Sequence, residues 1–336
     1  MYKKTNIPVL LLHNIDNGWD HEEIETAYRE IGLIESSLKQ EGHPLTSVAV
    51  ENSDLEGYLK KFDPGEHVVL NWCESLPGVP RSEAIVAQTL ESFSFAYTGS
   101  PPDILRACWD KCSVKRMLEH HGIPTPRWEV YASPSPEEDW GIFPAIVKPA
   151  YEHCSYGVTS DAVVTNRTEL HDRIAYVLET FQCPALVEDF IDGREFHVSL
   201  WGNGIINMLP PAEMDFRMLT DVHDRLCTYD AKFKPGSRHY EAIDVLLPAP
   251  LGPGERAHLE TTARAAYAVM GCRDYARLDI RLRDGVFYVL DINPNPDISS
   301  DTSMAAAAAL QGYSYGAMLS KIVNLAAMRH PVFGRQ

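Results

Sequence analysis

The sequence predicts an α/β protein with three α+β lobes. Its 336 residues and 45% apolar content allow large hydrophobic cores, and a chain of this length commonly divides into two or three domains. Strand-like apolar runs alternate with helical hydrophobic patterns from residue 7 onward, which is typical of sheets packed against helices. We place the lobes at residues 1–107, 108–187 and 188–336.

Composition limits the functions that the chain can have. The formal net charge of -17 argues against binding to nucleic-acid phosphates, since such proteins carry basic patches. The apolar runs at residues 7–12 and 304–310 are too short for a signal peptide or a membrane span. The seven cysteines form no C-x-x-C pairs, which favours reduced thiols over structural zinc. We therefore expect a cytoplasmic protein that acts on small molecules.

The first lobe is predicted to contain a small parallel sheet. Apolar strands at residues 7–13 and 68–70 flank a helical pattern at 24–38. Ligand loops of such sheets follow the strand ends, so Glu74 is a candidate substrate contact, together with Glu23 near the start of the helix.

The second lobe begins at the segment GIPTPRW, which must be extended because proline disfavours helix in the residue before it. A strand at residues 143–150 then carries Lys148 near its end, where a buried ammonium group needs an anionic partner. The following loop offers Ser155 and Gly157, with backbone N–H groups suited to phosphate oxygens, although an ordinary loop is the competing interpretation.

Glu188 and Glu195 lie at the start of the third lobe. Their carboxylates could accept hydrogen bonds from an exocyclic amine and a ribose, while Phe190 and Ile191 could contact a base. On these residues alone the pattern favours an ordinary acidic loop.

The segment YARLDIRLRDGVFYVLDIN predicts a β-hairpin. A two-residue turn at Asp284-Gly285 would place Asp279 and Asp291 on opposite faces. We prefer a three-residue turn with a bulge at Gly285, which opposes Arg277 to Asp291. The core face would then comprise Leu278, Ile280, Leu282, Tyr288, Leu290 and Ile292.

The other face of this hairpin gathers Arg277, Asp279, Asp291 and Asn293. Carboxylate and amide oxygens suit Mg²⁺, which usually also binds substrate phosphates when the protein supplies few ligands. A solvated sheet face with an Arg–Asp pair is the alternative. The prolines that follow Asn293 and Asn295 favour a site, since they end the strand and expose the amides.

These motifs occur together in one known family. WDK, IVKPAYEHCSYG, LVEDFIDGREF, YDAKF, YARLDI and LDINPNP follow the order and approximate spacing of ATP-grasp enzymes, and residues 97–325 most resemble the D-alanine:D-alanine ligase branch. The resemblance implies an ATP-grasp architecture with the nucleotide between the central and C-terminal lobes. It also implies an ATP-dependent ligase that joins amino acids or their analogues through an acyl phosphate. ATP and two Mg²⁺ ions, with Mn²⁺ as a substitute, would be the cofactors, and a homodimer is the implied assembly.

The same resemblance implies residue roles. The nucleotide would be held by Lys111, Lys148, Glu152, Ser155, Gly157, Glu188, Asp189, Phe190, Ile191, Glu195 and Lys232, with residues 152–157 as a flexible lid. Metal ligands would be Asp279, Asp291 and Asn293. Catalytic groups would be Arg277, Lys232 and Ser155, and substrate contacts Arg277, Asn293, Asp297, Glu23 and Glu74.

Three positions depart from the usual pattern of the branch. Asp291 replaces a glutamate, Cys154 a serine and Asp297 a glycine. A carboxylate at position 297 would repel a plain amino-acid carboxylate and favour a substrate with an additional cationic group. We therefore expect a ligase with other substrates. The alternatives are D-alanine:D-alanine ligase proper and a non-catalytic ATP-binding regulatory protein.

Overall fold

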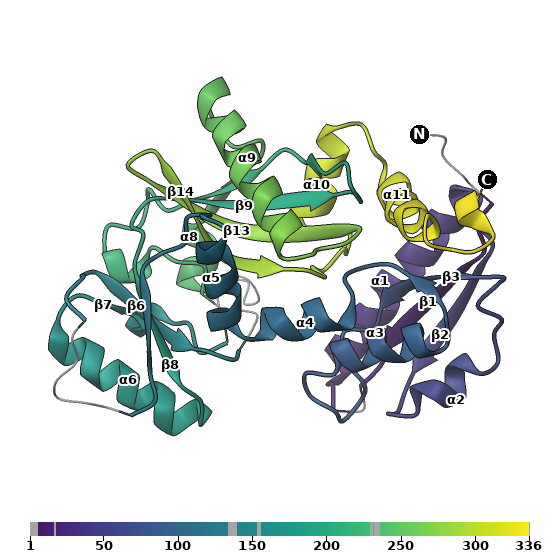
Figure 1. Cartoon of the computed structure of the whole chain (residues 1–336), viewed down its shortest axis with the longest axis horizontal. Helices are drawn as coiled ribbons and strands as arrows, with labels where there is room; N and C mark the ends of the chain where they lie inside the picture. The colour runs from purple at the N-terminus through teal and green to yellow at the C-terminus, as the bar shows by residue number, and fades with distance from the viewer. Residues whose placement is uncertain are drawn as a thin grey trace.

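Three β-sheets, one in each lobe, organise the chain, and the expected α/β class is confirmed (Figure 1). The computed structural model describes residues 6–16, 18–133, 140–152, 156–228, 231 and 236–335. Ser155, Lys232 and Cys154, which the sequence placed at the site, lie outside the described residues. Among the residues described, no helix combines the length and the apolar character needed to cross a bilayer.

The first lobe is a four-stranded parallel sheet in the order β2-β1-β3-β4. Its elements are β1 (Val9–Asn14), α1 (His21–Gln40), β2 (Leu45–Val50), α2 (Leu55–Leu59), β3 (Val68–Trp72), α3 (Glu83–Ser92), β4 (Ala96–Tyr97) and α4 (Pro102–Trp109). All of β1 is buried, as expected for a parallel strand covered on both faces. The distant helix α11 (Tyr315–Ala327) packs against α1 and β3, so the end of the chain returns to this lobe (Figure 1).

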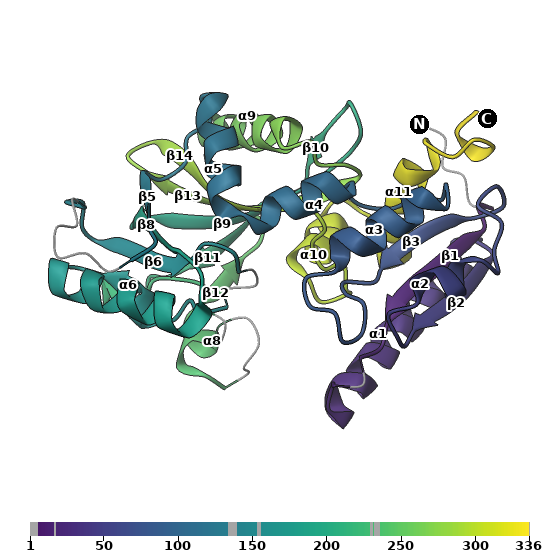
Figure 2. The same cartoon turned by 60° about the horizontal axis from the view of Figure 1, so that its bottom comes forward.

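The central lobe is an antiparallel sheet in the order β5-β8-β6-β7. Its elements are β5 (Trp128–Tyr131), β6 (Ala145–Pro149), η1 (Ser160–Ala162), β7 (Val163–Val164), α6 (Arg167–Phe181) and β8 (Ala185–Asp189). Helix α6 covers one face of this sheet with buried apolar side chains (Figure 2). Helix α5 (Lys111–His120) precedes the sheet and packs against the third lobe. Lys111 on α5 and Lys148 on β6 therefore lie on elements anchored in a core.

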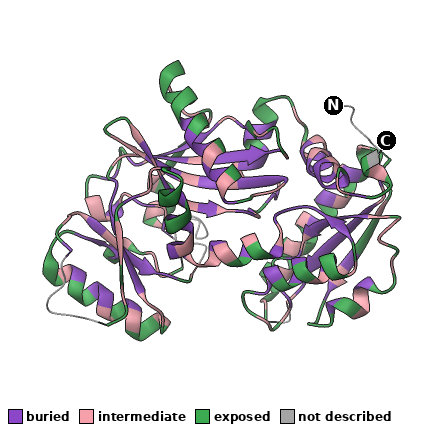
Figure 3. Ribbon diagram, viewed as in Figure 1, coloured by how far each residue is buried: buried purple, intermediate pink, exposed green. Residues whose placement is uncertain are grey.

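The third lobe contains the largest sheet, in the order β12-β11-β9-β13-β14. Its elements are β9 (Arg194–Trp201), β10 (Asn207–Met208), β11 (Ala212–Asp215), η2 (Val222–Asp224), α8 (Arg238–Ala242), β12 (Asp244–Leu246), α9 (Pro253–Val269), β13 (Tyr275–Arg283), β14 (Val286–Asn293) and α10 (Ser303–Leu310). The short helix η3 (Phe333–Arg335) follows α11 at the first lobe. The long central strands are largely buried (Figure 3), because α9 and α5 pack beside them. Each described cysteine is a free thiol.

The β13–β14 hairpin differs from the predicted one. Its turn has only two residues, Asp284 with φ of 52° and Gly285 with φ of 79°, which is the backbone that a tight hairpin turn requires. The predicted three-residue loop and the pairing of Arg277 with Asp291 were wrong. From Arg283 to Ile280 the strands follow the two-residue register, with Ile280 opposite Val289.

A bulge at Leu290 then changes the pairing. Asp279 lies opposite Asp291 and Arg277 lies opposite Asn293, so one unpaired residue returns the polar side chains to a common face. That grouping, which the sequence predicted from a different turn, is confirmed. The two-residue turn also changes the core face from the predicted one. Phe287 and Val289 are buried in the core, whereas Tyr288 and Leu290 are only half-buried.

Candidate active site

A cavity of about 560 Å³ is lined by residues of all three lobes. Most of the site residues predicted from the sequence border it: Glu74, Lys111, Lys148, Glu152, Glu188, Asp189, Phe190, Ile191, Glu195, Arg277, Asp279, Asp291, Asn293 and Asp297. Residues separated by more than 200 positions in the chain thus meet in one hollow.

Among the predicted site residues that the structure describes, Glu23 and Gly157 do not border the cavity. Glu23 lies in the exposed first turn of α1, where its carboxylate accepts a hydrogen bond from the backbone N–H of Asp20 at 2.8 Å. The Asp20 carboxylate accepts one from Glu23 in return, so this glutamate caps the helix. Gly157 has φ of +77°, and its carbonyl accepts a hydrogen bond from Arg173 at 2.6 Å. A Cβ there would lie 2.5 Å from the Phe181 ring, so glycine is required locally.

One wall of the cavity carries lysines around a single buried carboxylate. Glu188 on β8 forms ion pairs with Lys148 on β6, at 2.8 Å, and with Lys115 on α5, at 3.0 Å. Lys115 also donates a hydrogen bond to the Thr125 hydroxyl at 3.0 Å. Lys111, one helical turn before Lys115, donates to the backbone carbonyl of Glu152. Sequence reasoning missed Lys115, although its i+4 spacing from Lys111 placed the two ammonium groups on one helix face.

The charges on this wall do not balance. Burial alone would raise the pKa of Glu188, but the ammonium groups of Lys115 and Lys148 outweigh burial and hold that pKa below its ordinary value. Burial lowers the pKa of Lys115 and of Lys111, and repulsion from Lys148 adds to both shifts. The single carboxylate of Glu188 therefore faces several ammonium groups, and the excess positive charge on this wall suits an anionic ligand.

The opposite wall is the polar face of the β13–β14 hairpin. Arg277 Nε lies 2.9 Å from Asp279 Oδ1, and Asp291 accepts a hydrogen bond from the backbone N–H of Ile292 at 3.0 Å. The Asn293 side-chain oxygen accepts from the backbone N–H of Asn295 at 3.2 Å. These short contacts fix the side chains close to the backbone. The donor set consists of hard carboxylate and amide oxygens, which fits Mg²⁺.

Two arginines of β13, Arg281 and Arg283, bind carboxylates that border the cavity at its floor, which is formed by Asp189, Ile191 and Glu195. Sequence reasoning missed both arginines. Arg281 Nε lies 2.7 Å from Glu195 Oε2, and its Nη1 donates to the Ile191 carbonyl at 2.9 Å. Arg283 donates to Asp189 at 3.0 Å. Burial would raise the pKa of Glu195, but Arg281 outweighs it and lowers that pKa. The alternation of β13 could have revealed them, because Arg281 and Arg283 share a face with Arg277 and Asp279.

The end of the cavity that faces the first lobe is acidic. Glu74, Glu83 and Asp297 border it. Desolvation by neighbouring protein groups, together with the charge of Asp297, raises the pKa of Glu74 to about 7. Burial raises the pKa of Glu83 to about 7 as well, although Trp109 Nε1 donates to its carboxylate at 2.8 Å. The nearby Arg81 is ion-paired with Glu152.

Asp297 is held in place by its neighbours. Its carboxylate accepts hydrogen bonds from the backbone N–H of Ser299 at 2.9 Å and from the Ser299 hydroxyl at 2.6 Å. The cavity is therefore polarised, with lysines at the central-lobe wall and carboxylates toward the first lobe. A ligand with an anionic end and a cationic end matches this distribution.

Comparisons with known proteins identify relatives of this chain. The family model described as D-ala D-ala ligase C-terminus matches residues 117–324. The chain is 30% identical over 304 residues to the uncharacterized protein y4sG of Sinorhizobium fredii, covering 88% of this chain and 87% of that protein. It is 31% identical over 310 residues to the D-alanine–D-alanine ligase of a Marinomonas species, covering 89% and 92% of the two chains.

The fold also matches a solved structure. The crystal structure of the D-alanine–D-alanine ligase from Bacillus anthracis complexed with ATP superposes with a TM-score of 0.71. The match covers 95% of this chain and 97% of that one, at 21% sequence identity. The shared architecture is the ATP-grasp fold, and it includes the first lobe, which lies outside the family model.

Proposed function

The chain belongs to the D-alanine–D-alanine ligase family of ATP-grasp proteins, and from that premise we propose that it joins a carboxylate to an amine at the expense of ATP. One observation carries the proposal. A single cavity brings a lysine wall, a pair of opposed aspartates and Arg277 together. Phosphate binding, metal binding and stabilisation of a developing oxyanion need these three kinds of group.

The lysine wall would bind ATP. Lys111 and Lys148 would contact phosphate oxygens, since they present positive charge that Glu188 alone does not balance. The Glu188 carboxylate would accept a hydrogen bond from the adenine amino group, and Phe190 and Ile191 would pack against the base. Glu195 would bind the ribose.

The hairpin face would hold the metal. Asp279, Asp291 and Asn293 would bind two Mg²⁺ ions, for which Mn²⁺ could substitute. When bound, the metal would neutralise charge on the phosphate oxygens. Asp291 is one methylene shorter than the glutamate common in this branch, so the ligand reaches less far from the strand.

The reaction follows from the weak electrophilicity of a carboxylate. A carboxylate oxygen would attack the γ-phosphorus of ATP and release ADP, giving an acyl phosphate. The nitrogen of the amine substrate would then bond to the acyl carbon, and phosphate would leave. Arg277 would stabilise the oxyanion of the tetrahedral state, which for one good donor is worth about 3 kcal/mol.

We assign an amine substrate with an additional cationic group to this ligase. The support is the acidic end of the cavity, where Asp297 replaces a glycine and lies near Glu74. Such an arrangement repels a second carboxylate and attracts an ammonium or guanidinium group. D-alanine has no such group, so D-alanine:D-alanine ligase activity is the second candidate, favoured only by the family match.

Release of ADP and phosphate from the purified protein tests the proposal. We expect turnover with ATP and Mg²⁺ only when a carboxylate and an amine are both present, and faster turnover with diamino acids than with alanine. The Asp297→Asn variant should lose at least about tenfold of that preference, which corresponds to ~1.4 kcal/mol. Turnover with D-alanine alone would support the second candidate. ATP binding without turnover across a broad panel of amino acids would contradict both and indicate a regulatory nucleotide-binding protein.

A further inference from the structure

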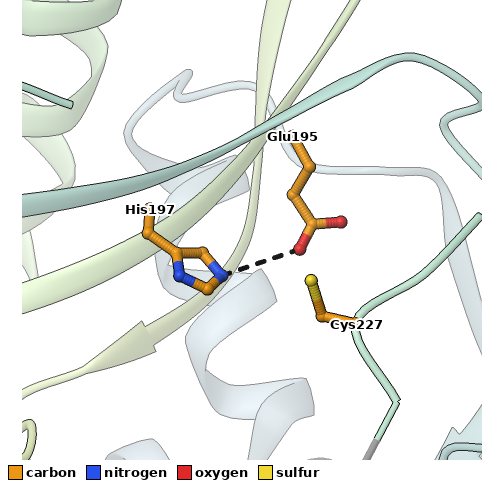
Figure 4. A group of neighbouring side chains, drawn as sticks. All are labelled: Glu195, His197 and Cys227. Atoms are coloured by element: carbon orange, nitrogen blue, oxygen red, sulfur yellow. Dashed lines mark ion pairs between the residues drawn. The ribbon is translucent and has the colours of Figure 1, made fainter. Parts of the chain in front are cut away.

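Three potential metal ligands converge beside the floor of the cavity. Glu195 and His197 are two residues apart on β9 and so share a face, and Cys227 follows η2. One ligand atom of each residue lies within 4.8 Å of those of the other two. His197 Nε2 is 3.8 Å from Glu195 Oε1, and Figure 4 shows the Cys227 sulfur directed toward the same carboxylate.

The ligand set suits one kind of cation. A thiolate, an imidazole and a carboxylate together favour Zn²⁺, whereas Mg²⁺ prefers oxygen ligands alone. In a tetrahedral zinc site, bond lengths of about 2.0–2.3 Å place neighbouring donor atoms about 3.3–3.6 Å apart. The observed 3.8 Å between His197 and Glu195 is close to that spacing. The Cys227 sulfur lies within 4.8 Å of both ligand atoms.

The surroundings orient these ligands. Arg281 binds Glu195 through Oε2 at 2.7 Å, which leaves Oε1 as the oxygen nearest His197. A partner that fixes the second oxygen of a ligating carboxylate is a common feature of metal sites. Asp279 Oδ1 lies 3.9 Å from the same nitrogen of His197 and could supply a fourth ligand. Glu195 and Cys227 both border the cavity, so an ion has a route of entry.

We propose that Glu195, His197 and Cys227 form a zinc-binding site that overlaps the nucleotide site. Zinc binding would release the thiol proton of Cys227 to solvent, so that the thiolate, the imidazole and one carboxylate oxygen bind the ion. A zinc ion held there occupies the carboxylate assigned above to the ribose. Zinc and ATP therefore exclude each other, and this last consequence rests on the proposed function.

Direct metal titration tests the site without any nucleotide. The metal-free protein is titrated with Zn²⁺ against a chromophoric chelator, and with Co²⁺ while thiolate-to-cobalt charge-transfer absorption is recorded. The wild type should bind one Zn²⁺ at this site and show the cobalt absorption. Cys227→Ser should abolish the absorption, and both Cys227→Ser and His197→Asn should weaken zinc binding at least about tenfold. Cys183→Ser, which changes a thiol on the central lobe, should match the wild type.

The proposal is overturned if the wild type gives no thiolate–cobalt absorption, or if Cys227→Ser binds zinc as tightly as Cys183→Ser. Binding of a fluorescent ATP analogue then tests the overlap. Zinc should raise the dissociation constant of the analogue for the wild type but not for Cys227→Ser, each compared with its own zinc-free value. Zinc binding with unchanged nucleotide affinity would retain the metal site and refute only its overlap with ATP.

Discussion

Asp279 on β13 lies directly opposite Asp291 on β14, at the step where the Leu290 bulge shifts the pairing of the two strands. Like charges on paired positions repel each other, and Arg277 Nε lies 2.9 Å from Asp279 Oδ1. A divalent cation between the two carboxylates would relieve this repulsion. The bulge therefore serves the site, because the two-residue turn alone would have turned Asp291 to the core face.

Removal of either carboxylate should abolish most of the activity. Asp279→Asn and Asp291→Asn would each remove a charged ligand of the proposed metal, and a catalytic metal contributes several kcal/mol to transition-state stabilisation. We expect ATP-dependent turnover to fall at least about 100-fold, measured as ADP release at saturating Mg²⁺. Asp284→Asn makes the same change in the exposed turn of the same hairpin and should leave turnover within about twofold. Equal losses in all three variants would contradict the assignment.

The sequence predicted this face from alternation, but it could not predict how the face arises. The turn and bulge compensate each other, so two different registers give the same grouping of Arg277, Asp279, Asp291 and Asn293. The parallel sheet of the first lobe and its helix near residues 24–38 followed from local patterns in the same way. Alternation and apolar periodicity are local properties, which a single sequence records directly.

What the sequence did not reveal depends on contacts between distant segments. Lys115 and Arg281 are charged residues of the kind that usually lies on the surface. Only their tertiary ion pairs with Glu188 and Glu195 show that they are buried. The packing of α11 against α1 likewise joins the two ends of the chain without a local signal. Buried ion pairs of this kind are invisible to hydrophobic patterns, since a charged residue counts as polar wherever it lies.

The lysine wall should be sensitive to loss of one cation. Lys115→Met leaves Glu188 with Lys148 alone, and breaking a buried ion pair is strongly destabilising. We expect the free energy of unfolding in urea at pH 7 to fall by about 3 kcal/mol. Lys60→Met breaks a comparable pair with Glu56 on the surface and should change it by less than about 0.5 kcal/mol. A loss as small as that of the surface variant would show that the buried pair adds little.

The same variant should respond differently to acid. The pKa of Glu188 is lowered in the folded state, so its contribution to stability is present above the unfolded value of 4.5 and is lost as the pH falls through the folded value. Lys115→Met weakens that shift. The unfolding free energy of the variant should therefore fall less between pH 6 and pH 3 than that of the wild type, and parallel curves would contradict this.

Gly157, the last residue of the predicted lid, offers a test of steric constraint. Gly157→Ala introduces a Cβ 2.5 Å from the Phe181 ring at a positive φ. Gly204→Ala carries the same conformational strain, with φ of +75°, but its Cβ would contact no atom within 4 Å. The loss of unfolding free energy in Gly157→Ala minus the loss in Gly204→Ala gives the cost of the clash with Phe181. We expect this cost to be about 1 kcal/mol or more in urea unfolding. Equal losses would mean that the Phe181 ring moves aside freely.

The acidic end of the cavity should reveal itself through the pH dependence of stability. The unfolded chain releases the Glu74 proton near pH 4.5, whereas the folded protein holds it to about pH 7, so the raised pKa makes stability fall as pH rises between these values. The glutamine side chain of Glu74→Gln cannot titrate. The unfolding free energy of this variant, relative to that of the wild type, should therefore increase from pH 5 to pH 8. Asp297→Asn removes the charge that adds to the shift and should show an intermediate response.

A cationic substrate analogue should restore stability to the wild type at pH 8 more than to Glu74→Gln, because the ionised carboxylate is its partner. A constant difference between Glu74→Gln and the wild type across this range would refute the raised pKa of Glu74.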